Sequence, residues 1–145
     1  MNFINALRIG ASGLSAQRLR MNVTSSNLAN INTTRTPGGG PYRRKDVVFS
    51  GKPLNSSFKE ILKGRMDKSI SEVRVSEIIE DSRKPHMKYE PSHPDADKKG
   101  YVKTPNINLM EEMANMISAS RSYEANATAI KATKDMALKA LEIGR

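Results

Sequence analysis

The stretch from Leu109 to Leu141 decides the fold, and it reads LMEEMANMISASRSYEANATAIKATKDMALKAL. Apolar and small residues recur in it at alternating steps of four and three, which is the a/d pattern of a helix with one packing seam. About 36 residues at roughly 1.5 Å each predict a rod near 54 Å long, too long for the core of a small globule. The predicted seam consists of Leu109, Met113, Met116, Ser120, Tyr123, Ala127, Ile130, Lys134, Ala137 and Leu141.

Both ends of this helix carry boundary signals. Pro105 precedes it, Asn108 is placed to cap its first turn, and Glu111 follows three residues later as in a capping box. Glu111 and the adjacent Glu112 diverge around the helix, so they suit capping and the positive end of the dipole rather than paired acid–base chemistry. Gly144 is the predicted stop.

A second helix is predicted from Asn2 to about Asn30. Apolar residues fall at strict seven-residue steps, and Ala6, Gly10, Ala11, Gly13 and Ala16 form a small-residue surface that lets another helix approach closely. Such a helix is marginal alone and needs packing for stability. Two readings stay open: the two helices pair in the core of a monomer, or their seams pack on other subunits. The heptad residues are Leu7, Leu14, Met21 and Leu28.

The middle of the chain, residues 31–105, changes character. β-favouring runs at 47–49, 71–81 and 87–90 predict strands, and residues 56–66 could form a short helical turn. Turn-rich pieces separate them, at 36–42, 50–57, 89–97 and 98–105. The predicted fold is mainly α with a small β insert, in which long N- and C-terminal helices form a coiled-coil-like arm pair. Its parts are 1–34 (helix and polar contact stretch), 35–105 (β-rich middle domain with loops) and 106–145 (long helix).

Composition narrows the classes of function. The 145 residues suffice for one ordinary domain, and no cysteine is present for a disulfide or a thiolate metal site. Net charge is +9, and residues 1–45 hold seven Lys or Arg with no acidic residue. This basic excess leaves three readings: a solvated face, attraction to an acidic partner, or a basic nucleic-acid-binding protein. A cytoplasmic coiled-coil adaptor is a further alternative.

Catalytic chemistry is not indicated. Gly38, Gly39 and Gly40 lie between two prolines and do not lead into a helix N-terminus, so a flexible turn is favoured over a phosphate loop. His86 and His93 with the nearby Asp95 and Asp97 lack regular ligand spacing. We expect no enzyme activity, no cofactor and no metal. No apolar run reaches the roughly 20 residues of a membrane span, and a cleavable signal peptide is not indicated.

Four blocks of the sequence carry a family resemblance. They are AQRLRMNVTSSNLAN at 16–30, GGPYRRKDVVF at 39–49, KYEPSHPDADKKGYVKTPNIN at 88–108 and EMANMISASRSYEANATAIKATKDMALKAL at 112–141. A helix running into SNLAN, then Thr-, Gly- and Pro-rich sequence, then PYRRK, resembles the flagellar axial proteins, which include rod, hook and hook-associated subunits. The four blocks together most resemble the proximal rod proteins of the flagellar basal body.

The resemblance implies a structural subunit that assembles helically, transmits torque and lines the export channel. It implies partners among other flagellar rod proteins, copies of itself, the inner-membrane ring and the export apparatus, with no nucleic acid and no direct membrane span. It also implies a place in the periplasmic basal body, reached through the flagellar type III apparatus without a cleavable signal. Ser25–Arg44 is the candidate lateral contact. The expected subunit-interface residues are Leu7, Leu14, Met21, Leu28, Asn27, Asn30, Tyr42, Arg43, Met113, Met116, Tyr123, Ile130 and Leu141.

Overall fold

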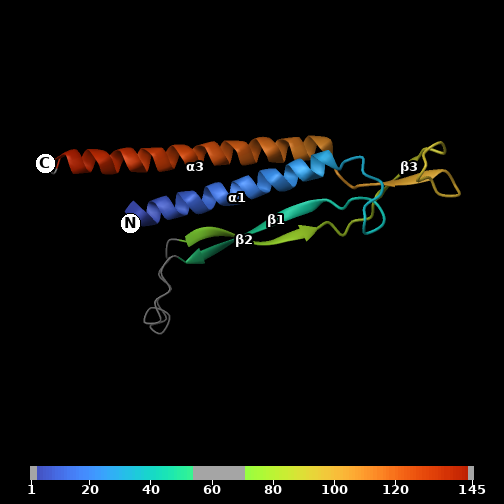
Figure 1. Ribbon diagram of the computed structural model, residues 1–145, viewed down its shortest axis with the longest axis horizontal. Helices are drawn as coiled ribbons and strands as arrows, with labels where there is room; N and C mark the ends of the chain where they lie inside the picture. The colour runs from blue at the N-terminus through green and yellow to red at the C-terminus, as the bar shows by residue number, and fades with distance from the viewer. Residues whose placement is uncertain (1–2, 54–70, 144–145) are drawn as a thin grey trace, which may run out of the picture.

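A computed structural model describes residues 3–53 and 71–143 (Figure 1). Two helices, α1 and α3, come from opposite ends of the sequence, and four strands lie between them. In chain order the elements are α1 (Phe3–Ala29), β1 (Lys45–Pro53), β2 (Ser71–Glu80), β3 (His86–Tyr89), β4 (Tyr101–Thr104) and α3 (Leu109–Ile143).

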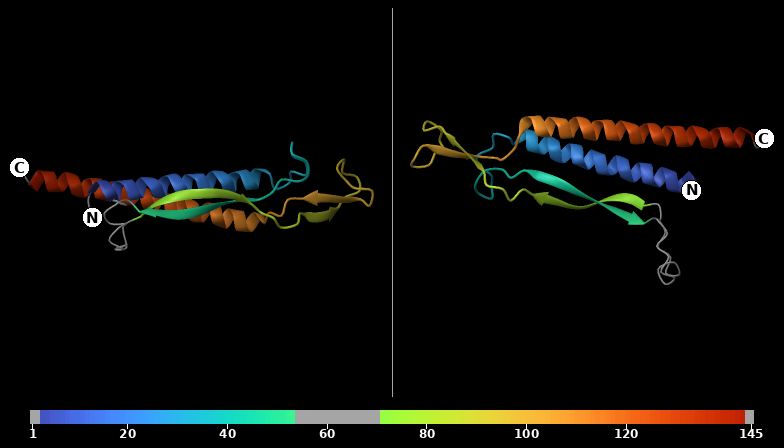
Figure 2. Two further views of the ribbon diagram at one scale, coloured as in Figure 1. Left: turned by 90° about the horizontal axis from the view of Figure 1, so that it is seen from below. Right: turned by 180° about the vertical axis from the view of Figure 1, so that it is seen from behind.

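The molecule is elongated, with α1 in the middle of three layers. Helix α3 runs antiparallel along one side of α1, and the β1–β2 hairpin lies along the other side (Figures 1 and 2). The β3–β4 hairpin projects at the end of the molecule opposite the two chain termini. This arrangement leaves the outward faces of both helices open to solvent.

Two glycines set the spacing between the helices. A Cβ atom on Gly10 would lie 2.6 Å from Cγ1 of Ile130, and one on Gly13 would lie 3.0 Å from Nδ2 of Asn126. Only a residue without a side chain allows the two backbones to come this close. The close helix approach predicted from the small residues of α1 is therefore present, and the helix that approaches belongs to the same chain.

The face of α3 that meets α1 is rotated from the predicted seam. Met116, Tyr123, Ile130 and Ala137 of that seam are half-buried, whereas its alternate members are mostly exposed. The remaining positions of the inner face are filled by smaller or polar residues, because these fit against the glycines and polar side chains of α1. The inner face consists of Glu112, Met116, Ala119, Tyr123, Asn126, Ile130, Thr133 and Ala137.

Both strand pairs are antiparallel. β1 pairs with β2 from Lys45↔Glu80 to Pro53↔Ser71, with a bulge beside Val48 and Phe49. β3 pairs with β4 from His86↔Thr104 to Tyr89↔Tyr101, where the two rings meet edge-on with centroids 5.3 Å apart.

The predicted strands at 47–49, 71–81 and 87–90 lie in β1, β2 and β3. Two turn predictions are wrong: residues 50–53 continue β1, and Tyr101–Thr104 form β4. In the second case Val102 is 1% exposed, and the burial of this side chain together with pairing to β3 outweighs the local turn signals. The helical turn predicted at 56–66 lies outside the described residues.

The apolar core is small. Among the described residues, the buried apolar side chains are Ala16, Val102, Pro105, Ile107 and Ala119, whereas Thr24, Asn27 and Glu112 are buried polar ones. Many large apolar side chains, such as Met110 and Leu141 at 72% exposed, lie at the surface. The chain therefore keeps polar groups inside its helix junction and leaves much of its apolar surface uncovered.

Candidate subunit interface

A polar junction joins the last turn of α1, the first turn of α3 and the start of β1. The side-chain amide of Asn27 donates from Nδ2 to the carbonyl oxygen of Lys45 at 2.8 Å and to Oε2 of Glu112 at 2.9 Å. Its Oδ1 accepts from the backbone N–H of Lys45 at 2.9 Å and from the Tyr42 hydroxyl at 3.1 Å. One buried amide thus pairs with both backbone groups of Lys45 as a neighbouring strand would, and it also binds α3.

Glu112 and Arg44 complete the junction as an ion pair. Nε of Arg44 donates to Oε1 of Glu112 at 2.7 Å, and Nη1 donates to Oδ2 of Asp46 at 3.0 Å. The Glu112 side chain is 1% exposed and that of Arg44 is 12% exposed. Burial lowers the pKa of Arg44, but the hydrogen bonds to Asp46 and Glu112 outweigh it and the pKa is raised. The guanidinium therefore stays charged opposite the carboxylate.

Asn108 caps α3 as predicted, because its Oδ1 accepts from the N–H of Met110 at 3.0 Å. Glu112, expected to serve capping, instead reaches the buried junction with Asn27 and Arg44. Sequence reasoning missed this ion pair, because its partners lie 68 positions apart in the sequence.

The polar stretch after α1 forms an ordered turn. The N–H of Thr36 donates to the carbonyl oxygen of Gly40 at 2.9 Å, and its hydroxyl lies 3.2 Å from the same oxygen. Gly39 and Gly40 have φ values of 84° and 76°, which residues other than glycine rarely adopt. The predicted turn at Gly38–Gly40 is therefore present, and its hydrogen bonds hold it in one shape where a flexible turn was expected.

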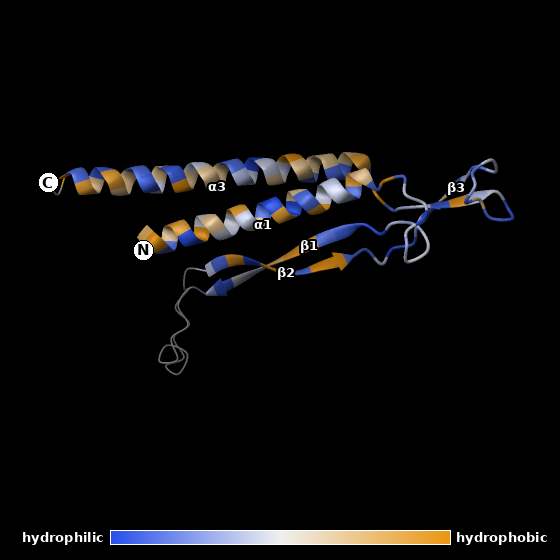
Figure 3. Ribbon diagram, viewed as in Figure 1, coloured by the Kyte–Doolittle hydropathy of each residue, from blue (hydrophilic) through white to orange (hydrophobic). Residues whose placement is uncertain are grey.

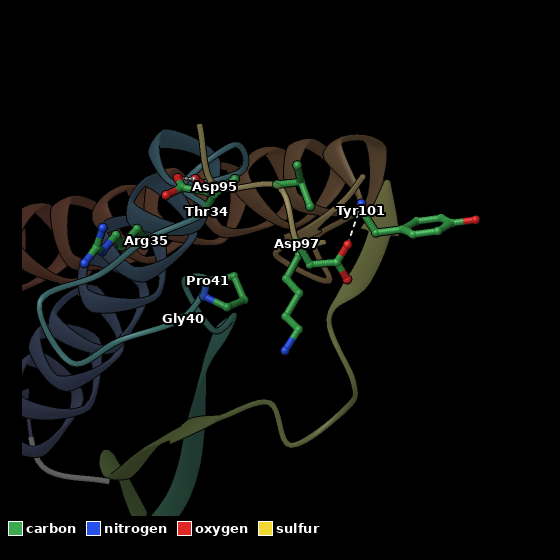
Figure 4. A pocket seen from close by; sticks show the side chains of 9 residues that line it. Thr34, Arg35, Gly40, Pro41, Asp95, Asp97 and Tyr101 are labelled. Carbon is green, nitrogen blue, oxygen red and sulfur yellow. Dashed lines mark hydrogen bonds between the residues drawn. The ribbon is translucent and has the colours of Figure 1, made fainter. Parts of the chain in front are cut away.

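This turn and the loop between β3 and β4 flank an open hollow of about 300 Å³ (Figure 4). The hydroxyl of Thr34 donates to Oδ2 of Asp95 at 2.8 Å and links the two segments. Asp97 accepts from the N–H groups of Lys99 and Tyr101 at 2.8 and 3.0 Å, and these bonds lower its pKa. Both carboxylates therefore hold loops in place. Across residues 3–53 and 71–143, no group of three His, Cys, Asp or Glu side chains could hold a metal ion.

The structure distributes the expected interface residues over three environments. Asn27 is 1% exposed, so its side chain serves the junction within the chain. Met116, Tyr123 and Ile130 are half-buried toward α1, and Met113, Leu141 and Arg43 are exposed. The half-buried remainder comprises Leu7, Leu14, Met21, Leu28, Asn30 and Tyr42. They are not brought together at one site, since they lie along both helices and the connecting loop.

Each helix also exposes one regular face. The sequence analysis did not identify either face, and only Met113 and Ser120 of the second belong to the predicted seam. The outer face of α1 consists of Ile4, Arg8, Ala11, Ser15, Arg18, Asn22, Ser25 and Ala29, and every one of them is exposed. The outer face of α3 consists of Met110, Met113, Ile117, Ser120, Glu124, Thr128, Lys131, Asp135, Leu138 and Glu142, of which only Ser120 is half-buried.

In the described part of the chain, neither helix is long and apolar enough to span a membrane.

Comparison with known proteins covers the whole chain. Residues 7–35 match the family described as flagella basal body rod protein, and residues 98–143 match the C-terminal family of the flagellar basal body rod FlgEFG proteins. The chain is 46% identical to the flagellar basal-body rod protein FlgC of Borreliella burgdorferi, covering 99% of this chain and 98% of that protein. It is 46% identical to the FlgC protein of Bacillus subtilis and 41% identical to that of Escherichia coli O157:H7, over the full length of each.

Proposed function

The chain belongs to the FlgC family of flagellar basal-body rod proteins, and from this premise we propose that it is a structural subunit of the proximal rod. It assembles with other rod proteins and with copies of itself, and the assembled tube transmits torque and lines the export channel. The observation that carries the proposal is the identity of 39–46% to FlgC proteins over nearly the full length of both chains.

The physical form of the molecule supports a subunit that is completed by neighbours. The described residues bury few apolar side chains, and apolar residues on α3 such as Met113 and Ile117 stay about half exposed. Transfer of a Met or Ile side chain from water into a subunit contact contributes roughly 1.5–3 kcal/mol. Several such contacts per subunit would turn an extended monomer into part of a stiff assembly.

The expected interface residues contribute to this proposal in different ways, depending on how exposed each side chain is. Met113, Leu141 and Arg43 are available for contact with another subunit as they stand. The heptad residues of α1 are half-buried, and their exposed parts would lie at the edge of such a contact; these residues are Leu7, Leu14, Met21 and Leu28. The side chain of Asn27 acts indirectly, because it fixes the junction from which the contact surfaces extend.

Location and partners follow from the same proposal. The subunit resides in the periplasmic part of the basal body, between the inner-membrane ring and the distal rod, after passage through the flagellar export apparatus. Contacts that do not close on themselves build a tube of stacked subunits rather than a closed dimer.

The test is a gene deletion combined with purification of basal bodies. We expect the deletion to abolish swimming, a plasmid copy to restore it, and the protein to be found by mass spectrometry in basal bodies isolated from the restored strain. A restored strain whose basal bodies lack the protein would contradict the proposal. Retention in the cytoplasm with nucleic-acid affinity that falls steeply with salt would instead favour a nucleic-acid-binding protein.

A further inference from the structure

The outer face of α1 is a continuous exposed stripe. From Ile4 to Ala29 its members follow one another at alternating steps of four and three, which keeps them on one side of a helix. Half of them are small, namely Ala11, Ser15, Ser25 and Ala29. At these four positions, side chains of another helix could approach the α1 backbone closely.

The outer face of α3 has the opposite character. Met110, Met113 and Ile117 are 72%, 46% and 53% exposed at one end, and Leu138 is 49% exposed toward the other. With 100° of rotation per residue, Met110, Met113 and Ile117 point away from the buried Ala119, and Leu138 points to the side. Figure 3 shows apolar colouring near both ends of this helix. Large apolar side chains therefore stand on one helix, and a stripe that could receive them runs along the other.

The charges on the two faces are complementary. The outer face of α1 carries Arg8 and Arg18 and no acidic residue, whereas that of α3 carries Glu124, Asp135 and Glu142 with one lysine. In the described part of the chain, Arg8 pairs with Glu72 at 3.5 Å and Arg18 has no ion pair. A cation is thus available on one face and acidic groups are available on the other.

We propose that the outer face of α3 in one copy packs against the outer face of α1 in a neighbouring copy. The inference rests on the proposed function, since it specifies how copies of this subunit meet within the rod. Each copy offers two different faces, so the contact is heterologous and can be repeated from copy to copy. Neighbours related by rotation about the rod axis point the same way. Because α1 and α3 are antiparallel within a chain, the two helices in this contact are antiparallel as well.

Disulfide cross-linking tests this pairing cleanly, because the natural chain contains no cysteine. One cysteine is placed on the α1 outer face and one on the α3 outer face, and basal bodies containing the double variant are oxidised and run on a non-reducing gel. A bond between neighbouring chains gives a ladder of dimers and larger species, whereas a bond within a chain does not. Nine double variants combine Ala11→Cys, Ser15→Cys or Asn22→Cys with Ser120→Cys, Thr128→Cys or Lys131→Cys, which covers different axial offsets.

Single-cysteine variants are the matched controls. We expect a ladder from at least one double variant and monomers from Ser15→Cys or Thr128→Cys alone. Basal bodies that contain all nine double variants but yield no ladder would overturn the pairing while leaving the rod function intact. Dimers from a single-cysteine variant would also overturn it, because like faces would then be meeting.

A charge reversal gives a second, independent readout. Arg18→Glu is expected to reduce swimming and to weaken the ladder of the best double variant, whereas Arg18→Lys keeps both because the positive charge remains. Since Arg18 is exposed and has no ion pair in the described part of the chain, the fold of the monomer should not change, and circular dichroism of the purified variant checks this. Wild-type swimming and an undiminished ladder with Arg18→Glu would count against the proposal.

Discussion

Nδ2 of Asn27 lies 2.9 Å from Oε2 of Glu112, and this hydrogen bond joins two residues that are 85 positions apart. It connects the end of the first helix with the beginning of the last one. Because the same amide holds the backbone of Lys45, one side chain fixes three elements relative to one another. The position of both outer helix faces relative to the β1–β2 hairpin therefore depends on this junction.

Replacement of Asn27 by Ala should destabilise the protein by about 2–4 kcal/mol, because it leaves both half-buried backbone groups of Lys45 and the buried Glu112 carboxylate without this partner. The measurement is urea unfolding followed by circular dichroism. Asn22→Ala, in the same helix but exposed, is the control and should stay within about 0.5 kcal/mol of wild type. Equal stability of the two variants would show that the amide bonds contribute little.

Glu112→Ala should lower the free energy of unfolding by about 3–5 kcal/mol. The substitution removes the carboxylate that accepts from Nε of Arg44, and the Arg44 side chain stays largely buried. Glu112→Gln keeps an acceptor but removes the charge, so its loss should be smaller. The neighbouring Glu111 is 56% exposed and lies 4.0 Å from Arg44, so Glu111→Ala should cost at most about 1 kcal/mol. Thermal and urea unfolding of the three variants check this order, and a Glu111 effect as large as that of Glu112 would contradict it.

Gly10→Ala should destabilise the helix pair even though alanine favours a helix by about 1 kcal/mol over glycine. The added methyl group would lie 2.6 Å from Cγ1 of Ile130, and overpacking typically costs about 1–3 kcal/mol. Adding Ile130→Ala removes the clashing atom, so the double variant should lose less than the sum of the two single losses. Gly38→Ala meets no atom within 4 Å and serves as the control. Strict additivity in the double-mutant cycle would argue against the contact.

Acid should loosen the β3–β4 loop through Asp97. Hydrogen bonds from the N–H groups of Tyr101 and Lys99 lower the pKa of this carboxyl below its ordinary value of 3.8. The stabilisation is therefore fully present above pH 3.8 and is lost as the pH falls through the lower folded value. NMR titration of these two amides should report a midpoint below 3.8, and Asp97→Ala should abolish the transition. A midpoint at or above the ordinary value would contradict the bonding.

The helices could be predicted from the sequence because their signals are local. The four-and-three spacing, the Asn108 cap and the small residues of α1 gave the extent of both helices and the closeness of their contact. The face of α3 that meets α1 was harder to predict, because Ala119 is buried and Asn126 is half-buried there although neither residue type signals an apolar seam. The three-part division at residues 34 and 105 stays a prediction.

The junction could not be predicted, because its partners are distant in sequence and its members are polar. Asn27 and Tyr42 stood out as part of a family signature, which suggested contact with a neighbour rather than a bond with each other. The strand at Tyr101–Thr104 was missed for a related reason, since only pairing with β3 and the burial of Val102 reveal it.

The unequal lengths of the helices have a mechanical consequence. Helix α3 has 35 residues and α1 has 27, and the contacts of Gly10 with Ile130 and of Asn27 with Glu112 show that the surplus lies at one end only. At about 1.5 Å per residue this surplus is roughly 12 Å, or two turns of single helix. In a stack of subunits, the protruding end of α3 would extend alongside the subunit of the next layer. The boundary between two layers would then not be flat. Bending of the rod at such a boundary would have to break contacts in both layers.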